Sequence, residues 1–250
     1  MFFHVIASGS KGNATIIKED DVVILIDMGI TLSRLEEGLD EINLKTSDID
    51  IALFTHDHSD HINGLKFIPI KKQYALEGTL PSSGYHILKV FEPFVYKDVV
   101  ITPIRTSHDA KNPCGYVIES KEAKLVYITD TGVFPQESIP YVLNPTYLIL
   151  ESNHDLKMLY KSNRPIELKK RIASDVGHLC NEDSALLAKD ILGKNTKEIV
   201  LAHISEECNT PEIALEAYEK IFSYFGLDIK RFNVRVANQY HSLTGGDYEN

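Results

Sequence analysis

The sequence predicts an α/β fold in the form of a four-layer αββα sandwich. Two observations lead to this prediction: β-like apolar runs fall into two clusters along the chain, and stretches with helical periodicity interleave with them. The chain has 250 residues, of which 43% are hydrophobic, so it can bury a large core. We therefore expect residues 1–250 to form a single domain, with the strands inside and the helices outside.

β-branched and aromatic residues mark the expected strands. In chain order these cover residues 2–7, 13–18, 22–27, 51–55, 99–106, 115–120, 124–129, 146–150, 198–202 and 233–236. Gly12-Asn13 forms a turn between the first two of them. At the other end of the chain, we expect residues 245–250 to be frayed.

Two helices have clear start signals. Asn181 to Ser184 precede an apolar-periodic stretch from Ala185 to Leu192, and Gly193 follows as a stop. Thr210-Pro211-Glu212 opens a second periodic stretch, from Ile213 to Phe225, with proline at the first helical position. The second helix would cover one face of a sheet.

A dense cluster of histidines and aspartates, His56-Asp57-His58-Ser59-Asp60-His61, follows the apolar run at 51–55. The two-residue period of an extended segment turns His56 and His58 toward the same side, where they can bind one ion. The chain must bend after Asp60, and His61 reads as the start of a helix, so Asp60 and His61 can face a second position. The pattern predicts two adjacent metals. The alternative, a group of surface polar residues, rarely gives so many ligand-type side chains in so few positions.

Three further candidates follow β-like runs and would lie at strand ends. His108 comes after residues 99–106, Asp130 after Leu125–Ile128, and His203 after Ile199–Leu201. Any of these alone would be an ordinary surface or core residue. Together with the His-x-His-x-Asp-His run and with Asp27, which ends the run at 22–26, their order resembles the ligand motifs of the metallo-β-lactamase superfamily.

This resemblance implies a dinuclear metal site. One metal would be held by His56, His58 and His108, a second by Asp60, His61 and His203, and Asp130 would bridge them. Asp27 would brace the ligand loop from behind. Because the ligands are imidazoles and carboxylates, the cofactors are two divalent ions for which zinc, manganese and iron stay open. The absence of a cysteine at position 130 departs from many dizinc members that hydrolyse antibiotics.

Four other segments resemble the YycJ/WalJ-type bacterial metallohydrolases, which act as DNA exonucleases in the 5′ to 3′ direction. These segments are Ser8–Thr15, Leu150–Asp155, Leu168–Ile172 and Gly177–Asn181. The resemblance implies a metal-dependent phosphodiesterase whose partner is nucleic acid, specifically DNA. Two departures stand out: Cys180 replaces an expected serine, and Glu206-Glu207 places two carboxylates near His203, which would weaken nucleic-acid contact there.

The same resemblance suggests roles in the reaction. A hydroxide between the two metals would attack phosphorus, with Asp60 orienting it and accepting its proton. His178 would serve the leaving group, and Glu151 would hold His178. His154 could bind a phosphate oxygen. For Glu151 and His154, a structural role is the alternative.

The overall charge does not favour nucleic acid, because 26 basic residues against 36 acidic ones give a net charge of -10. One segment differs from this average. It contains Lys157, Lys161, Arg164, Lys169, Lys170 and Arg171 against the single acid Glu167. We expect it to track a phosphate backbone, with Lys169, Lys170 and Arg171 as substrate contacts; the alternative is a solvated helix face.

The composition argues against membrane-spanning, secreted and disulfide-rich proteins. No apolar run is long enough to span a membrane, and residues 1–7 lack the basic start of a signal peptide. The three cysteines are widely spaced, which argues against a disulfide framework, so we expect reduced thiols and a cytoplasmic protein. Three functions other than a DNA exonuclease stay open: a ribonuclease, a hydrolase of small phosphodiesters or thioesters, and a non-catalytic metal-bound adaptor. The sequence does not set the oligomeric state.

Overall fold

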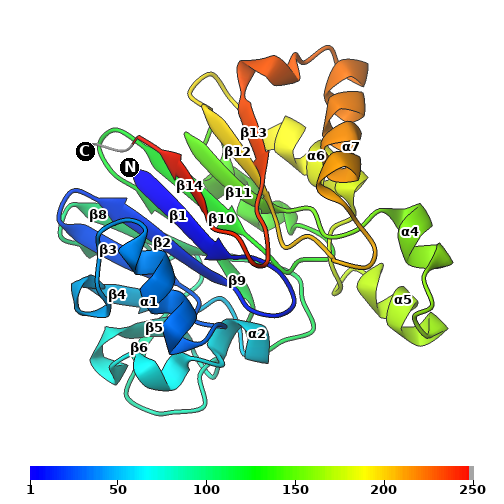
Figure 1. Cartoon of the computed structure of the whole chain (residues 1–250). Coiled ribbons are helices and arrows are strands. Elements are labelled where there is room, and N and C mark those ends of the chain that lie inside the picture. The colour runs from blue at the N-terminus through cyan, green and yellow to red at the C-terminus, as the bar shows by residue number, and fades with distance from the viewer. Residues whose placement is uncertain (248–250) are drawn as a thin grey trace.

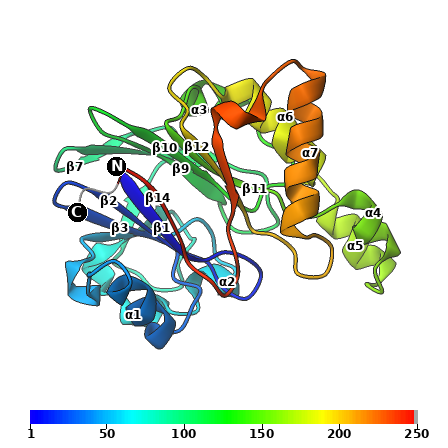
Figure 2. The same cartoon turned by 45° about the horizontal axis from the view of Figure 1, so that its top comes forward.

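Two seven-stranded sheets face each other in the computed structural model of the chain, which describes residues 1–247 (Figure 1). Helices cover the outer face of each sheet, as the turned view in Figure 2 also shows. The predicted four-layer αββα sandwich is therefore confirmed.

The first sheet has the strand order β14-β1-β2-β3-β4-β5-β6. Its strands are β1 (Phe2–Ala7), β2 (Ala14–Glu19), β3 (Val22–Ile26), β4 (Ile51–Leu53), β5 (Gln73–Leu76), β6 (His86–Leu88) and β14 (Leu243–Gly246). β1, β2 and β3 pair antiparallel, whereas β3 to β6 pair parallel.

The second sheet has the strand order β13-β12-β11-β10-β9-β8-β7. Its strands are β7 (Phe94–Tyr96), β8 (Val99–Arg105), β9 (Cys114–Glu119), β10 (Lys124–Ile128), β11 (Tyr147–Glu151), β12 (Glu198–Ala202) and β13 (Asn233–Val236). Here β8, β9 and β10 pair antiparallel, and β10 to β13 pair parallel. Each sheet thus repeats one pattern, an antiparallel trio followed by parallel strands.

Helices fall into two outer layers and a separate pair. They are α1 (Leu32–Asp40), α2 (Ser59–Ile62), α3 (Ile139–Val142), α4 (Leu156–Lys161), α5 (Ile166–Ile172), α6 (Asn181–Ile191) and α7 (Pro211–Tyr224). α1 lies against the first sheet, and α6 and α7 lie against the second, whereas α4 and α5 stand at one edge of the sandwich (Figure 1). We call this pair the α4–α5 arm.

Alternation along the strands divides the core into layers. Ile24 of β3 and Ile149 of β11 belong to the cluster between the two sheets. Their neighbours point outward: Leu25 packs in the cluster that contains Leu35 of α1, and Leu150 packs with α6 and α7. This period of two is what an extended backbone imposes, and it buries both faces of each sheet.

Every strand that the sequence predicts is present, with its ends shifted by at most two residues. The two predicted helices are also present, with Cys180 and Thr210 as their N-caps. Two expectations were wrong. The helix expected to begin at His61 begins at Ser59. The tail predicted to be frayed, residues 245–250, was placed to begin too early, because Gly245 and Gly246 pair with β1. Residues 248–250 lie outside the described chain.

Candidate metal centre

The candidate site lies where parallel strands from both sheets end. Asp27 follows β3, Asp130 lies two residues beyond β10, and His203 directly follows β12. All three have left-handed backbone, with φ of 59°, 53° and 54° respectively. This conformation costs residues other than glycine about 1–2 kcal/mol each, and it recurs here at the ends of three strands that meet at the candidate site.

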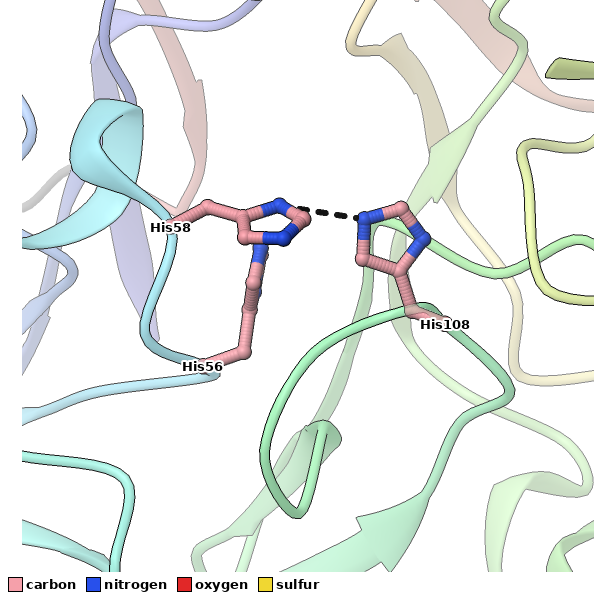
Figure 3. Close-up of side chains that lie close together, drawn as sticks. All are labelled: His56, His58 and His108. Atoms are coloured by element: carbon pink, nitrogen blue, oxygen red, sulfur yellow. Dashed lines mark hydrogen bonds between the residues drawn. The ribbon is translucent and has the colours of Figure 1, made fainter. Parts of the chain in front are cut away.

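His56, His58 and His108 form one cluster (Figure 3). One ring nitrogen from each lies within 4.8 Å of the other two. His56 and His58 extend from the same loop after β4, and His108 approaches from the loop after β8, with 3.3 Å between His108 Nε2 and His58 Nδ1. The structure thus brings together the three residues predicted to hold the first metal.

A second cluster contains Asp60, His61 and His203, again with ligand-type atoms within 4.8 Å of one another. Asp130 lies between the clusters: its Oδ2 is 3.1 Å from His61 Nε2, and its Oδ1 is 3.9 Å from His108 Nε2. This is the position expected of a bridging carboxylate. Metal binding by these seven residues stays a prediction.

Asp27 is fully buried behind the ligand loop. Its Oδ2 lies 2.7 Å from His61 Nδ1, and it accepts hydrogen bonds from the Thr55 N–H and hydroxyl. A carboxylate on Nδ1 fixes the orientation of the ring and leaves Nε2 facing the cluster. Thr55, which the sequence analysis did not single out, also contacts the rings of His56 and His61.

The donor set fits a cation. Within residues 1–247, His56 Nε2 and His203 Nε2 are buried without a hydrogen-bond partner, although both residues belong to the ligand clusters. Such atoms are costly to bury unless a ligand satisfies them. The chemistry of the set, imidazole and carboxylate, suits zinc, manganese or iron.

The pKa values of two ligand histidines, His56 and His61, shift in opposite directions. Burial, reinforced by the nearby His61, lowers the pKa of His56 well below its ordinary value, which keeps that ring neutral. Burial acts in the same direction on His61, but Asp27 and Asp130 outweigh it and raise the His61 pKa. The same carboxylates would attract a divalent cation, so protons and metal compete for this centre.

Glu151, the last residue of β11, lies beneath the centre and is fully buried. His178 Nδ1 is 2.7 Å from its Oε1, and Oε2 accepts from the backbone N–H groups of Thr131 and Leu179. Burial alone would raise the pKa of Glu151, but His178 lowers it, so the carboxylate is ionised. Both oxygens of Glu151 already have hydrogen-bond partners, which favours a role in orienting His178 over a role in binding an ion. Glu151 and His178 nevertheless lie close to Asp130 and His203, and these four residues form a further group of ligand-type atoms.

Two asparagines also reach the ligands, although the sequence analysis assigned them no role. Asn13 Nδ2 lies 3.0 Å from His61 Nε2, and Asn153 Nδ2 lies 3.2 Å from His203 Nδ1. Both belong to segments, Ser8–Thr15 and Leu150–Asp155, that carry the family resemblance. The family resemblance of these segments could have indicated a role for the two asparagines, but only the fold shows which side chain of each segment faces the site.

His154 is buried, and within the described chain neither of its ring nitrogens has a hydrogen-bond partner. Burial lowers its pKa to about 4, so the ring is neutral at physiological pH. A neutral, enclosed imidazole has less to offer a phosphate than a charged, open one. Its proposed contact with substrate stays a prediction.

The basic segment forms the α4–α5 arm, and its cations differ in accessibility. Lys169 is buried, and its ammonium donates to the carbonyls of Tyr160 and Ser162 at the end of α4. Lys170 is exposed and paired with Glu167, and Arg171 is half exposed and paired with Asp109, the neighbour of His108. Lys170 and Arg171 are therefore the members of the predicted trio that are open to a substrate.

The two carboxylates expected to weaken nucleic-acid contact are each paired. Glu206 lies 2.8 Å from the Lys11 ammonium, and Glu207 lies 2.8 Å from Arg164 Nε. Their charge is therefore partly neutralised.

Cys114, Cys180 and Cys208 are buried free thiols. Within the described residues, no helix has the length and apolar character that a membrane crossing requires.

Comparison with known proteins agrees with this geometry. Residues 23–204 match the family described as β-lactamase superfamily domain. Exodeoxyribonuclease YycJ of Bacillus anthracis is 34% identical over 254 residues, covering 96% of this chain and 94% of the relative. Exodeoxyribonuclease WalJ of Streptococcus pneumoniae is 35% identical, covering 85% of this chain and 84% of the relative. In fold, the crystal structure of the metallo-β-lactamase fold protein YhfI from Bacillus subtilis superposes with a TM-score of 0.71 at 18% identity, covering 98% of this chain and 100% of YhfI.

Proposed function

The chain belongs to the β-lactamase superfamily, as a metal-dependent hydrolase of the metallo-β-lactamase fold, and we propose that it is a DNA exonuclease working from the 5′ end. The observation that carries this proposal is the Glu151–His178 pair beside the ligand clusters. A metal centre that also has an oriented imidazole can supply both a nucleophile and a proton for the leaving oxygen of a phosphodiester. The names of the YycJ and WalJ relatives support DNA as the substrate.

Two bound divalent ions would lower the pKa of a water molecule between them and stabilise the charge that develops on the phosphate oxygens. Asp60 would orient this water and accept its proton; its carboxylate lies 3.7 Å from His203 Nε2, and its side chain is 21% exposed. His178 keeps Nδ1 on Glu151, which leaves Nε2 for the departing oxygen.

DNA is favoured over a small substrate by the position of the α4–α5 arm. Arg171 reaches Asp109 at the edge of the first ligand cluster, and Lys170 is exposed on the same helix. Cations beside a metal centre can hold the phosphates that flank the scissile one. A small phosphodiester or thioester would not need them.

The direct test is digestion of 5′- and 3′-labelled DNA and RNA, single- and double-stranded, by the purified protein with manganese or zinc. We expect nucleotides to be lost from the 5′ end of DNA, and we expect His58→Ala to abolish the activity. His86→Ala, which removes an exposed imidazole from the edge strand β6, is the matched control. Digestion of RNA alone would identify a ribonuclease instead, and no digestion with any metal would favour the small-substrate hydrolase.

Charge reversal tests the arm. Lys170→Glu with Arg171→Glu should weaken DNA binding and reduce the slope of log affinity against log salt by about one for each lost phosphate contact. Lys121→Glu with Lys230→Glu changes the net charge equally, at exposed positions before β10 and β13, where those strands begin far from the site. An unchanged salt slope in the first variant would remove the arm from the DNA path.

Loss of catalysis distinguishes an enzyme from an adaptor. Asp60→Ala should reduce nuclease activity by several orders of magnitude, whereas a non-catalytic adaptor would keep its cellular function without this carboxylate.

A further inference from the structure

Three loops form a rim on the side of the metal centre that carries His203. They comprise residues 8–13, 203–209 and 237–241, and they are joined by hydrogen bonds from the His203 N–H to Ser8 Oγ and from the Lys11 N–H to Gln239 Oε1. Tyr240 is 54% exposed on this rim. It lines two pockets, of about 350 Å³ and about 250 Å³.

Both pockets lie close to the candidate ligands. The larger is lined by Gly29, whose N–H donates to the Asn13 carbonyl, and Asn13 in turn contacts His61. The smaller is lined by Ile204 and Ser205, which directly follow His203. A polymeric substrate whose backbone crosses the metal centre would therefore also contact this rim.

Tyr240 is fixed in place through its backbone. Its N–H donates to Asn238 Oδ1 at 2.7 Å, and its carbonyl accepts from the Arg34 guanidinium at 3.2 Å. Its hydroxyl contacts the ammonium of Lys11. An aromatic ring held in this way presents a surface at little further cost in conformational entropy.

The rim lacks the excess of basic residues that the α4–α5 arm has. Lys11 is paired with Glu206, and Arg34 Nη1 lies 3.8 Å from Glu37 Oε2, so the cations at the rim are matched by acids. A region without excess positive charge does not attract phosphates, but a half-exposed aromatic ring beside two pockets suits flat, uncharged groups. Nucleobases stack on such rings in proteins that bind single strands.

We propose that Tyr240 is the stacking platform for unpaired nucleobases of the DNA strand, on the side of the metal centre that carries His203. This inference rests on the proposed nuclease function and makes it more specific. The arm holds phosphates, and the Tyr240 rim holds bases, so the strand must be single where it crosses the rim. A duplex would have to fray or carry an overhang before its terminal nucleotide reached the metals.

The test is fluorescence anisotropy of the manganese-loaded protein with labelled single-stranded DNA that has cleavage-resistant phosphorothioate linkages. Tyr240→Ala should weaken binding by about 5- to 150-fold, the range for loss of one stacked base. Tyr240→Phe keeps the ring and should bind within about twofold of the parent protein. Tyr224→Ala, which removes an 83% exposed tyrosine at the end of α7, is the matched control and should change nothing.

A second arm of the experiment uses DNA with abasic sites. If a base stacks on Tyr240, an abasic site at the contacted position should remove the difference between Tyr240→Ala and the parent protein. Equal losses in Tyr240→Phe and Tyr240→Ala would overturn the proposal, because they would assign the effect to the hydroxyl on Lys11. Unchanged binding by Tyr240→Ala while the parent protein digests DNA would also overturn it and leave the nuclease function standing. A parent protein that neither binds nor digests DNA would overturn both.

Discussion

At the scale of single residues, the centre depends on side chains that do not touch a metal in the proposed arrangement. Asp27, Asn13 and Asn153 contact the ligand histidines, and Thr55 joins Asp27 to the ligand loop. The contacts of Asp27 and Asn153 with Nδ1 atoms leave the Nε2 atoms of His61 and His203 facing the clusters before any ion arrives. Preorganisation of this kind explains why the chain tolerates three left-handed residues at the strand ends.

Asp27→Asn tests this preorganisation. The amide keeps the shape but loses the charge that holds His61, so we expect metal affinity to fall by about 10- to 100-fold. Titration calorimetry of the metal-free protein with zinc or manganese measures the change. Asp50→Asn is a suitable control, because Asp50 accepts from the Val23 N–H just before β4, at the opposite end of that strand from the site. Equal metal affinity in Asp27→Asn and the parent protein would contradict the bracing role.

His154 predicts how stability depends on pH. Burial lowers its folded pKa to about 4 from an ordinary value of 6.5, so the unfolded chain binds the additional proton between these values. Its effect is absent above pH 6.5, grows as the pH falls and is complete below 4. It amounts to about 3 kcal/mol of lost unfolding free energy.

Urea unfolding of the EDTA-treated protein at a series of pH values measures this effect. His154→Gln should lose less stability than the parent protein as the pH falls from 6.5 to 4. His241→Gln removes an imidazole from an exposed position and should keep the slope of the parent protein. Equal slopes in His154→Gln and the parent protein would show that His154 does not contribute to acid destabilisation.

At the scale of elements, the α4–α5 arm has its own small core and its own fastening. Leu159, Ile172 and Cys208 form a cluster separate from the main core, and Lys169 closes the end of α4. Lys169→Met would leave two carbonyls without their charged donor, so we expect the unfolding free energy to fall by about 2 kcal/mol. Lys170→Met, at the neighbouring exposed position, should change it by less than about 0.5 kcal/mol.

Urea unfolding with paired measurements of DNA affinity separates the two lysines. We expect Lys170→Met to affect DNA binding at low salt and Lys169→Met to affect stability. If Lys169→Met weakened DNA binding and Lys170→Met lowered stability, Lys169 would be a substrate contact, as the charge pattern alone suggests.

The elements that the sequence reveals are those whose pattern comes from burial. β10, β11 and β12 are almost wholly buried and read as continuous apolar runs, which is why they were predicted. β6 and β7 are three-residue edge strands with exposed side chains, and no such pattern marks them. β14 contains Gly245 and Gly246, which strand propensity disfavours, but a side chain at 245 would collide with the Phe3 ring, so tertiary packing decides its sequence.

The candidate site shows the same division. The predicted ligand groups of the two metals were found as two clusters because their motifs are dense and ordered. The role of Lys169 could not be read from charge, because whether an ammonium faces water or two carbonyls depends on how α4 meets α5. Similarly, the two pockets beside Tyr240 exist only because residues 8–13 and 237–241, at opposite ends of the chain, fold together.

At the scale of the whole molecule, the two sheets are related by a repeat that the sequence does not reveal. Each has an antiparallel trio, β1–β3 or β8–β10, followed by parallel strands. β7 joins β8 just as β14, from the far end of the chain, joins β1. The candidate ligands lie at the corresponding ends of both halves, so the centre belongs to neither sheet alone.

This arrangement predicts that metal stabilises the whole fold. Ions bound by His61 after β4 and by Asp130 and His203 after β10 and β12 would connect the two sheets. A ligand that binds only the folded state stabilises it by about 2.7 kcal/mol at a hundredfold excess over its Kd. For a chain of this size, that corresponds to a rise in Tm of about 5–10 °C.

Thermal unfolding of the EDTA-treated protein, with and without added zinc or manganese, measures the rise. Asp130→Asn removes the charge of the bridging carboxylate and should reduce the rise to a small fraction of the parent value, because both clusters lose a shared ligand. Asp50→Asn, at the remote end of the sandwich, should keep the full rise. If metal raises the Tm of Asp130→Asn as much as that of the parent protein, Asp130 does not bridge the two ions and the connection between the sheets runs through other residues.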